Sequence, residues 1–338
     1  MIAVQEGPAS LLPAPVPAGR VFITGARGFV GSALVRRYRE MGADVRGLDL
    51  IADPANAIVA GDISGAGDWQ EHVAGCELVV HTAAVVSNVA SRETCWRTNV
   101  LGTRNVLDAA LRGGARRVVH FSSVDAYSIV DFPDDVTESY PLRPDGDGFH
   151  YGESKVAGEA VVWQAHAAGE IACTVVRPTD IYGPNGRANI ILPLQYIKSG
   201  QFFLPASGYW NPVYIDDLVD GVVRAGGIDA GVGQAFNLGG GLKMLTRDFF
   251  ARLCQWANKK PVVLKKTTLL RLSGAIYRAT KLFGRSTEVC PASIYMIAKP
   301  GGYSIEKARR LLGYEPRMSL EEGMRLTEAW LRANGYLD

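Results

Sequence analysis

The sequence predicts a doubly wound α/β fold, in which a parallel sheet has helices on both faces and carries a smaller C-terminal lobe. Three observations predict it. Continuous apolar segments alternate with segments of helical length from Arg20 to Val176, as expected for buried parallel strands. A glycine-rich turn that begins at Gly25 follows the first of these segments. Beyond Asp180 the pattern changes to irregular segments rich in Gly and Pro.

The composition of the 338 residues is that of an ordinary globular protein, with 47% hydrophobic and 21% charged residues. A formal net charge of +2 gives no electrostatic basis for binding nucleic acid. No apolar run reaches the roughly 18 residues that would span a bilayer. The cysteines are odd in number and lack paired spacing, which argues against disulfides or zinc and favours a reducing, cytoplasmic location. They are Cys76, Cys95, Cys173, Cys254 and Cys290.

The N-terminal stretch 1–18 predicts a flexible arm, because it carries four prolines among alanines. It lacks the basic start and continuous apolar core of a signal peptide.

The first strand, Arg20–Thr24, leads into the turn Gly25–Gly31 and then a helix that extends to Tyr38. Glycines allow a tight turn in which backbone amides at a helix N-terminus approach a pyrophosphate. The sequence therefore predicts a Rossmann-type dinucleotide site. Its expected contacts are Gly25, Gly28, Phe29, Val30 and Gly31.

The next strand, Asp44–Leu50, contains Asp49, which lies 18 residues beyond Gly31. A carboxylate near that spacing accepts hydrogen bonds from the ribose hydroxyls of NAD and repels the 2′-phosphate of NADP. Arg27 could instead meet that phosphate. We expect NAD rather than NADP, because a carboxylate at the strand end discriminates more directly.

Two further strands extend the predicted cofactor site. After the strand Ala57–Ile63, Asp62 and Ile63 could reach the adenine, although Asp62 could equally be a turn residue. The strand Leu78–Ala84 ends in small residues that allow the cofactor to lie close, and His81 within it is predicted to be a core histidine. The small residues are Thr82, Ala83 and Ala84.

A helix over 94–111 carries Asn99, whose amide is expected to brace the site, and the strand Arg117–Ser123 ends in two serines. Ser123 is the predicted partner of a substrate oxygen, and Ser122 is a structural residue beside the cofactor. The acidic residues of the loop 130–147 predict a solvated loop and not a metal site.

Tyr151 and Lys155 stand four residues apart, so they share one face of a predicted helix. An ammonium held near a phenol favours the phenolate and lowers its pKa from about 10. Such a tyrosine can take a proton from an alcohol or give one to a ketone. A surface lysine beside a half-buried tyrosine is the simpler alternative, and the accompanying nucleotide motifs argue against it.

The sixth strand, Ile171–Val176, leads to Pro178 and Thr179 at the cofactor, and a helix over 213–225 and a short strand over 236–239 follow. We expect the nucleotide-binding domain to comprise 19–180 with 213–238. The substrate lobe is then 181–212 with 239–338.

With these motifs in this order, the chain resembles the extended short-chain dehydrogenases/reductases of the NAD-dependent epimerase/dehydratase superfamily. The resemblance implies that Ser123, Tyr151 and Lys155 are catalytic, that Asn99 is a fourth, structural member, and that NAD is the cofactor. We also expect a homodimer. The matching segments are TGARGFVG, HTAA, NVLGTRNVLDA, FSSVDAY, YGESK, RPTDIYGP and VYIDDL.

Within that superfamily the chain is most similar to the 3β-hydroxysteroid dehydrogenases, including the sterol-4-carboxylate 3-dehydrogenases, which share the pattern Ser122-Ser-Val-Asp125. Sugar-nucleotide epimerases usually have an asparagine where this chain has Asp180, and an arginine where it has the segment 209–212. The resemblance therefore implies oxidation of a secondary alcohol on a hydrophobic, steroid- or lipid-like substrate. A sugar-nucleotide epimerase with tightly bound NAD is the alternative.

The segment 265–285 predicts a basic amphipathic helix. Arginines recur every seven residues on one face, and an apolar stripe follows another. Such a helix could lie on an anionic membrane, or it could be a lid helix packed on the lobe. The predicted stripe is Leu269, Leu272, Ile276, Ala279 and Phe283.

Overall fold

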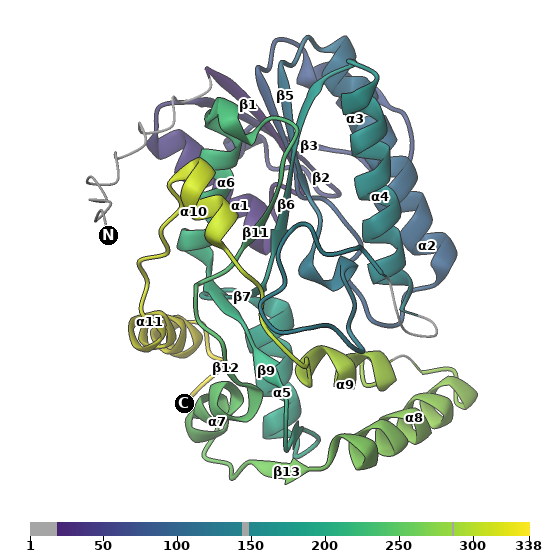
Figure 1. The fold of residues 1–338 in the computed structure, drawn as a ribbon, viewed down its shortest axis with the longest axis vertical. Coiled ribbons are helices and arrows are strands. Elements are labelled where there is room, and N and C mark those ends of the chain that lie inside the picture. The colour runs from purple at the N-terminus through teal and green to yellow at the C-terminus, as the bar shows by residue number, and fades with distance from the viewer. Residues whose placement is uncertain (1–18, 144–148, 286) are drawn as a thin grey trace, which may run out of the picture.

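The centre of the protein, seen in a computed structural model that describes residues 19–143, 149–285 and 287–338, is a seven-stranded parallel sheet. Its strand order is β3-β2-β1-β4-β5-β6-β11, so the order reverses between β1 and β4 (Figure 1). The doubly wound fold is confirmed. The strands are β1 (Arg20–Thr24), β2 (Asp44–Asp49), β3 (Ile58–Ala60), β4 (Leu78–His81), β5 (Arg117–Phe121), β6 (Ala172–Pro178) and β11 (Ala235–Leu238).

Helices cover both faces of this sheet, and each buries an apolar stripe against it (Figure 1). On one face, Leu34 and Tyr38 of α1 belong to a core cluster that continues into the C-terminal lobe. On the other face, Val106 and Ala110 of α3 pack with Val162 of α4. The first face carries α1 (Phe29–Glu40), α6 (Ile215–Gly227) and α10 (Glu306–Leu312), and the second α3 (Gly102–Arg112) and α4 (His150–Ala167).

The remaining elements form the lobe below the carboxyl ends of the strands (Figure 1), around an aromatic cluster of Tyr182, Trp210, Phe249 and Phe250. Its helices are α5 (Leu192–Lys198), α7 (Thr246–Trp256), α8 (Lys266–Leu282), α9 (Pro291–Ile297) and α11 (Leu320–Ala333). Its strand pairs are β7 (Asp180–Tyr182) with β10 (Pro212–Tyr214), β8 (Phe203–Pro205) with β13 (Val262–Leu264), and β9 (Tyr209–Trp210) with β12 (Met244–Leu245).

Two predicted helices have different boundaries. The helix expected over 94–111 begins at α2 (Arg92–Trp96), passes through a π-helical turn over Arg97–Leu101 and continues as α3. Such π turns are frequent at functional sites. Val213 belongs to β10 and not to a helix, because it pairs with Ile181 of β7.

The apolar stripe predicted for 265–285 is divided in the structure. Leu269 is buried, whereas Leu272 and Phe283 are exposed to 38% and 77%. The predicted helix is α8, whose buried residues are Leu269 and Ser273, while Ile276 is half-buried and Leu272 lies exposed on the same stripe. Among the described residues, no helix is long and apolar enough to cross a membrane.

Candidate active site

The predicted site residues gather at the carboxyl ends of β1, β4, β5 and β6. In open α/β sheets ligands bind outside these ends, at the point where the strand order reverses. Parallel strands bring their carboxyl ends to one edge, which explains why residues far apart in the sequence meet here.

The glycine turn after β1 has the geometry of a phosphate cradle. Gly25 has φ +67°, a conformation that L side chains rarely adopt, and its carbonyl accepts a 3.0 Å hydrogen bond from the backbone N of Gly28. A Cβ at Gly31 would lie 2.0 Å from that carbonyl oxygen, so only glycine fits. The predicted contacts Phe29 and Val30 lie in the first turn of α1, beside its free amides.

Asp49 closes the end of β2 beside this turn. Its carboxylate accepts hydrogen bonds from the backbone N of Arg27 (2.9 Å) and of Leu50 (2.8 Å). The guanidinium of Arg27 points instead to the carbonyl of Ile51, at 3.4 Å. The structure therefore holds the carboxylate in place at the turn, while the arginine is exposed and weakly held.

The predicted adenine-side residues follow β3. Asp62 is exposed and its carboxylate accepts a 2.8 Å hydrogen bond from the backbone N of Ser64, which is a turn contact, and its contact with adenine stays a prediction. Ile63 is buried in the core, and its carbonyl accepts from the amide of Asn105.

The end of β4 is fixed to β1 by short polar contacts. The hydroxyl of Thr82 donates to the carbonyl of Thr24 (2.6 Å), and the backbone N of Ala83 donates to the hydroxyl of Thr24 (3.2 Å). His81 contacts Thr24 and Thr103, and burial lowers its pKa to about 3. It is a neutral core histidine, as predicted.

Asn99 lies in the π turn and joins two parts of the site. Its amide oxygen accepts from the backbone N of Val85 (2.8 Å), and its amide nitrogen donates to the carbonyl of Val85 and to the hydroxyl of Ser154 (2.9 Å). Since Ser154 donates in turn to the carbonyl of Tyr151, Asn99 braces both the loop that follows β4 and the start of α4.

Ser123, Tyr151 and Lys155 are brought together, and all three are buried. Burial raises the pKa of Tyr151 and the carboxylate of Asp125 adds to this, whereas a hydrogen bond with Ser123 lowers it. The net direction is upward. The prediction that Lys155 depresses the pKa of Tyr151 is therefore not met in this structure, because desolvation of the phenolate outweighs the nearby cations.

Lys155 donates its closest hydrogen bond to the carbonyl oxygen of Phe121, at 2.7 Å, and burial lowers the pKa of the lysine to about 8. Its Nζ lies 5.8 Å from the centroid of the Tyr151 ring. The ammonium thus stands beside the phenol at the end of β5.

Sequence reasoning missed one element of the site, the ion pair of Lys299 with Asp180 and Asp125. Lys299 is 1% exposed, and its Nζ lies 2.7 Å from Asp180 and 3.4 Å from Asp125. The backbone N of Asn211 also donates to Asp180, at 2.8 Å. A lysine inside the apolar run that leads from Ile297 to Pro300 was the one sequence signal of this pair.

The buried hydroxyls of Ser122 and Thr179, which follow β5 and β6, have no hydrogen-bond partner. Buried polar groups normally find a partner, so these hydroxyls fit contact with the polar parts of a bound nucleotide. Pro178 ends β6 directly before Thr179. Together with the glycine turn and Asp49, these groups fit NAD.

The surroundings of Tyr151 on the lobe side are apolar. Ile129, Phe149 and Tyr151 form one buried cluster, against which three residues of α9 pack. Those residues are Ala292, Tyr295 and Met296.

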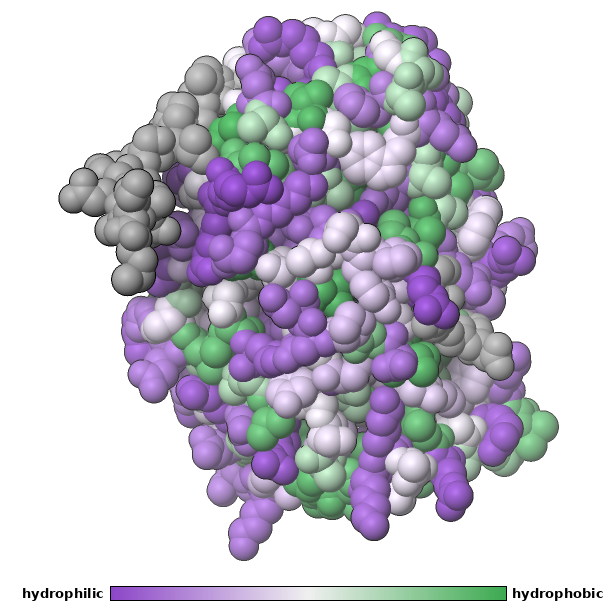
Figure 2. Space-filling view, in the orientation of Figure 1, coloured by the Kyte–Doolittle hydropathy of each residue, from purple (hydrophilic) through white to green (hydrophobic). Residues whose placement is uncertain are grey.

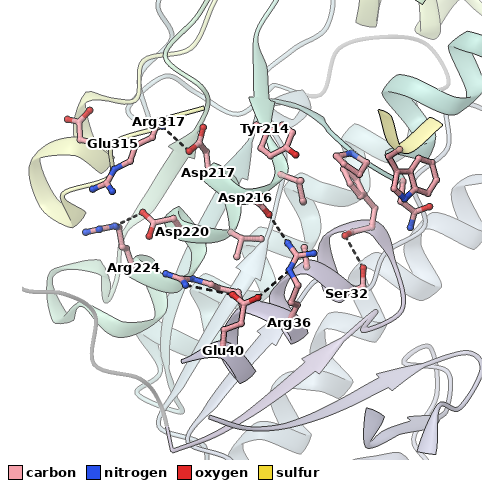
Figure 3. Close-up of a pocket in the computed structure, with 18 residues that line it drawn as sticks. Ser32, Arg36, Glu40, Tyr214, Asp216, Asp217, Asp220, Arg224, Glu315 and Arg317 are labelled. Atoms are coloured by element: carbon pink, nitrogen blue, oxygen red, sulfur yellow. Dashed lines mark hydrogen bonds and ion pairs between the residues drawn. The ribbon is translucent and has the colours of Figure 1, made fainter. Parts of the chain in front are cut away.

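A cavity of about 930 Å³ lies elsewhere, between α1, α6 and the segments 184–185 and 315–317 (Figure 3). Its walls are charged and paired internally. Arg36 contacts Asp216 at 2.7 Å and Arg224 contacts Asp220 at 2.6 Å. Ser123, Tyr151 and Lys155 do not line this cavity, so it is separate from the reacting centre. In the part of the chain that the structure describes, no group of three or more His, Cys, Asp or Glu could hold a metal ion.

Comparison with known proteins agrees with this geometry. The profile of the NAD dependent epimerase/dehydratase family matches residues 21–239, and the chain belongs to this family. A 3-beta-hydroxysteroid dehydrogenase of Mycolicibacterium neoaurum is 29% identical, over 90% of this chain and 89% of its own. A UDP-glucose 4-epimerase of Mycolicibacterium smegmatis is 27% identical, over 93% and 98%.

Solved structures give the same fold. The protein gox2253 superposes with a TM-score of 0.77 at 27% identity, covering 95% of this chain and all of its own. A double mutant of DesIV, a dTDP-glucose 4,6-dehydratase of Streptomyces venezuelae solved with NAD bound, has a TM-score of 0.73 at 25% identity, covering 94% and 98%. The chain is thus an NAD-dependent enzyme of the extended short-chain dehydrogenase/reductase type. Because its relatives include dehydrogenases, epimerases and dehydratases, they do not define its substrate.

Proposed function

We propose that the protein transfers hydride between NAD and the secondary alcohol or ketone of a hydrophobic, steroid- or lipid-like substrate. In this proposal residues 19–180 with 213–238 bind the nucleotide. Residues 181–212 with 239–338 bind the substrate. Tyr151 takes the proton from the alcohol oxygen, or returns it to the ketone, and Ser123 binds that oxygen. Lys155 holds the nicotinamide ribose, as Tyr151 beside it also contacts the cofactor, and its ammonium lies next to the phenol. NAD, when bound, supplies the hydride acceptor.

The observation that carries this proposal is the buried ion pair of Asp180 and Lys299. A sugar nucleotide brings a diphosphate, whose charge needs cationic or amide donors in the site. In this chain Asp180 places a carboxylate there instead. The nearest lysine, Lys299, is ion-paired with both Asp180 and Asp125. Trp210 covers the pair with its ring 5.8 Å from Lys299. The ammonium of Lys299 and the backbone N of Asn211 are therefore both bound to carboxylates and are not free for a diphosphate.

The apolar wall around Tyr151 supports the same substrate class. Ile129 and Phe149 line it from the nucleotide-binding domain, and Tyr295 and Met296 of α9 from the lobe. Each Å² of apolar ligand surface buried there contributes about 25 cal/mol. The 3-beta-hydroxysteroid dehydrogenase relative adds weight to this assignment.

The epimerase alternative needs cations from other positions of the lobe, and Lys198 and Arg187 are the two candidates. Lys198 donates instead to the carbonyl of Tyr336 near the C-terminus, whereas Arg187 is exposed at the start of a helical turn. Of these two cations, Arg187 is therefore the one that could serve a diphosphate.

Calorimetry with UDP and with a sterol-like secondary alcohol, both in the presence of NAD, separates the two functions. We expect binding of the alcohol, formation of NADH, and no measurable heat with UDP. Micromolar binding of UDP without a response to the alcohol would support the epimerase. Arg187→Ala is the matched variant: it should leave alcohol binding unchanged, and abolish UDP binding if the alternative holds.

We further propose that the protein is a homodimer.

We also propose that α8 contacts a membrane surface. Leu272, Leu282 and Phe283 are exposed on or next to α8. Basic residues flank them, and no acidic residue occurs between Asp248 and Glu288. Figure 2 shows hydrophobic surface at the outer end of this helix. Such a face suits anionic lipid.

Co-sedimentation with vesicles of phosphatidylglycerol and of phosphatidylcholine tests the membrane contact. We expect binding to the anionic vesicles only, and its loss in the double variant Leu282→Ser, Phe283→Ser. Leu111→Ser removes an exposed leucine of α3 and serves as the matched control. Sedimentation without vesicles gives the oligomeric state.

A further inference from the structure

Ser123 is held by Asp125. Its hydroxyl donates a 3.0 Å hydrogen bond to the carboxylate of Asp125, whose own backbone N donates to the serine Oγ at 3.1 Å. Because a hydroxyl has a single proton, this arrangement fixes the rotamer of Ser123.

Asp125 is held in turn from the lobe. The second carboxylate oxygen of Asp125 lies 3.4 Å from Lys299 Nζ, which binds Asp180 at 2.7 Å. The rings of Trp210 and Tyr303 each lie 5.8 Å from the same ammonium. All five residues are buried, so solvent screens their charges little.

The three charged residues come from three parts of the fold. Asp125 follows β5, Asp180 begins β7 and Lys299 follows α9. The backbone carbonyl of Lys299 accepts a 2.9 Å hydrogen bond from Tyr209, which ties this segment to the lobe. The position of the lobe therefore determines whether Asp125 has its counter-ion.

We propose that Lys299 and Asp125 are positioning residues of the reacting centre: the ammonium from the lobe fixes the Asp125 carboxylate, and that carboxylate orients Ser123 and sets the charge next to Tyr151. The inference rests on the proposed function, in that Ser123 and Tyr151 are taken as the reacting hydroxyls. It does not depend on the substrate class.

The groups that act on Tyr151 come from several elements. Burial and Asp125 raise the pKa of the phenol, Ser123 and Lys299 lower it, and Cys95 of α2 raises it slightly. Asp180 belongs to the same cluster but makes no contact with Ser123. This difference provides a matched pair of substitutions, Asp125→Asn and Asp180→Asn, which change the charge of the cluster by the same amount.

The test compares these two variants as complexes with NAD. The readouts are the pH dependence of kcat for oxidation of a secondary alcohol that the protein turns over, and the NMR shift of the hydroxyl-bearing ring carbon in tyrosine-labelled protein. Tyr151→Phe assigns the signal. We expect Asp125→Asn to lower the apparent pKa of Tyr151 by about one unit, and Asp180→Asn to lower it by less than half as much. Equal shifts, or no shift with Asp125→Asn, overturn the proposal.

Lys299→Met should act in the opposite direction. It leaves two buried carboxylates without their counter-ion, so the apparent pKa of Tyr151 should rise and kcat at neutral pH should fall, with KM little changed. Lys299→Arg should restore most of kcat. If Lys299→Met does not fold, the two Asn variants still decide. Full turnover by Tyr151→Phe would instead refute the proposed function itself.

Discussion

Lys155 binds the end of β5 directly: its Nζ donates a 2.7 Å hydrogen bond to the carbonyl oxygen of Phe121. The ammonium is buried, and this desolvation lowers its pKa from 10.5 to about 8. A neutral carbonyl compensates a buried charge only in part. At neutral pH the charged lysine therefore costs stability, as functional groups held in apolar surroundings often do.

Lys155→Met is accordingly expected to be more stable than the natural protein at pH 7. Lysine in the unfolded chain titrates near pH 10.4, so between about pH 8 and 10 the unfolded state binds more protons, and the stability of the natural protein rises with pH across that window. The free energy of unfolding of the variant should exceed that of the natural protein by about 1–3 kcal/mol at pH 7, and this gap should close toward pH 10.

Thermal unfolding at pH 7 and pH 10 measures that gap. A variant that is less stable at pH 7 would show that the hydrogen bond to Phe121 contributes more than the desolvation of Lys155 costs.

Tyr151→Phe should abolish turnover and leave NAD binding nearly intact, because only the proton carrier is lost. General acid–base catalysis contributes about 10²–10⁴-fold, so a loss of at least a hundredfold in kcat is expected. Tyr295→Phe removes a hydroxyl from the neighbouring apolar wall and should change kcat by less than about threefold. Equal losses in the two variants would assign the effect to packing and not to proton transfer.

The sequence predicted the sheet and most of the site for physical reasons that act locally. Buried parallel strands are continuous apolar runs, and their carboxyl ends share one edge of the sheet. The four-residue spacing of Tyr151 and Lys155 places them on one helical face. Asp49 ends β2 and Ser123 follows β5 by two residues, so their place at that edge follows from the fold.

What the sequence did not predict depends on tertiary packing. Lys299 meets Asp125 only because the lobe folds back over 173 residues of intervening chain, and no periodicity marks that contact. The sign of the pKa shift of Tyr151 depends on burial, which the spacing of two residues does not reveal. In α8, helical periodicity shows which residues share a face but not which part of that face is packed, so it did not predict that Leu269 is buried and Leu272 exposed.

Asp49→Ala should narrow or reverse the preference for NAD over NADP. The carboxylate of Asp49 is held at the turn by the backbone N of Arg27, and its removal eliminates the negative charge that would repel a 2′-phosphate. The Arg27 guanidinium, held only by a 3.4 Å contact to Ile51, would then be free to meet that phosphate. Fluorescence titration with both nucleotides gives the ratio of Kd values. Asp53→Ala is the control, since its carboxylate binds Asn56.

A natural protein that already binds NADP more tightly would mean that Arg27 outweighs Asp49. In that case Arg27→Ala, and not Asp49→Ala, should change the ratio.

Glu159→Ala is expected to be strongly destabilising. Glu159 is buried one helical turn beyond Lys155, and its carboxylate forms a two-pronged ion pair with the buried Arg177, with one N···O distance of 3.1 Å. Arg177 also donates to the hydroxyl of Tyr127 at 2.7 Å. Removing the carboxylate leaves a guanidinium in the core without its counter-ion, at a cost of about 3–5 kcal/mol.

Glu322→Ala breaks a pair of the same chemistry that Glu322 forms with Arg325 on the surface, and should cost only about 0–1 kcal/mol. Urea unfolding of both variants measures the contrast. Because α4 carries Tyr151 and Lys155 and the Glu159–Arg177 pair anchors this helix to β6, Glu159→Ala should also lower kcat, whereas Glu322→Ala should not. Equal destabilisation by the two variants would mean that burial adds nothing to the Glu159–Arg177 pair, and that α4 is held by its apolar face alone.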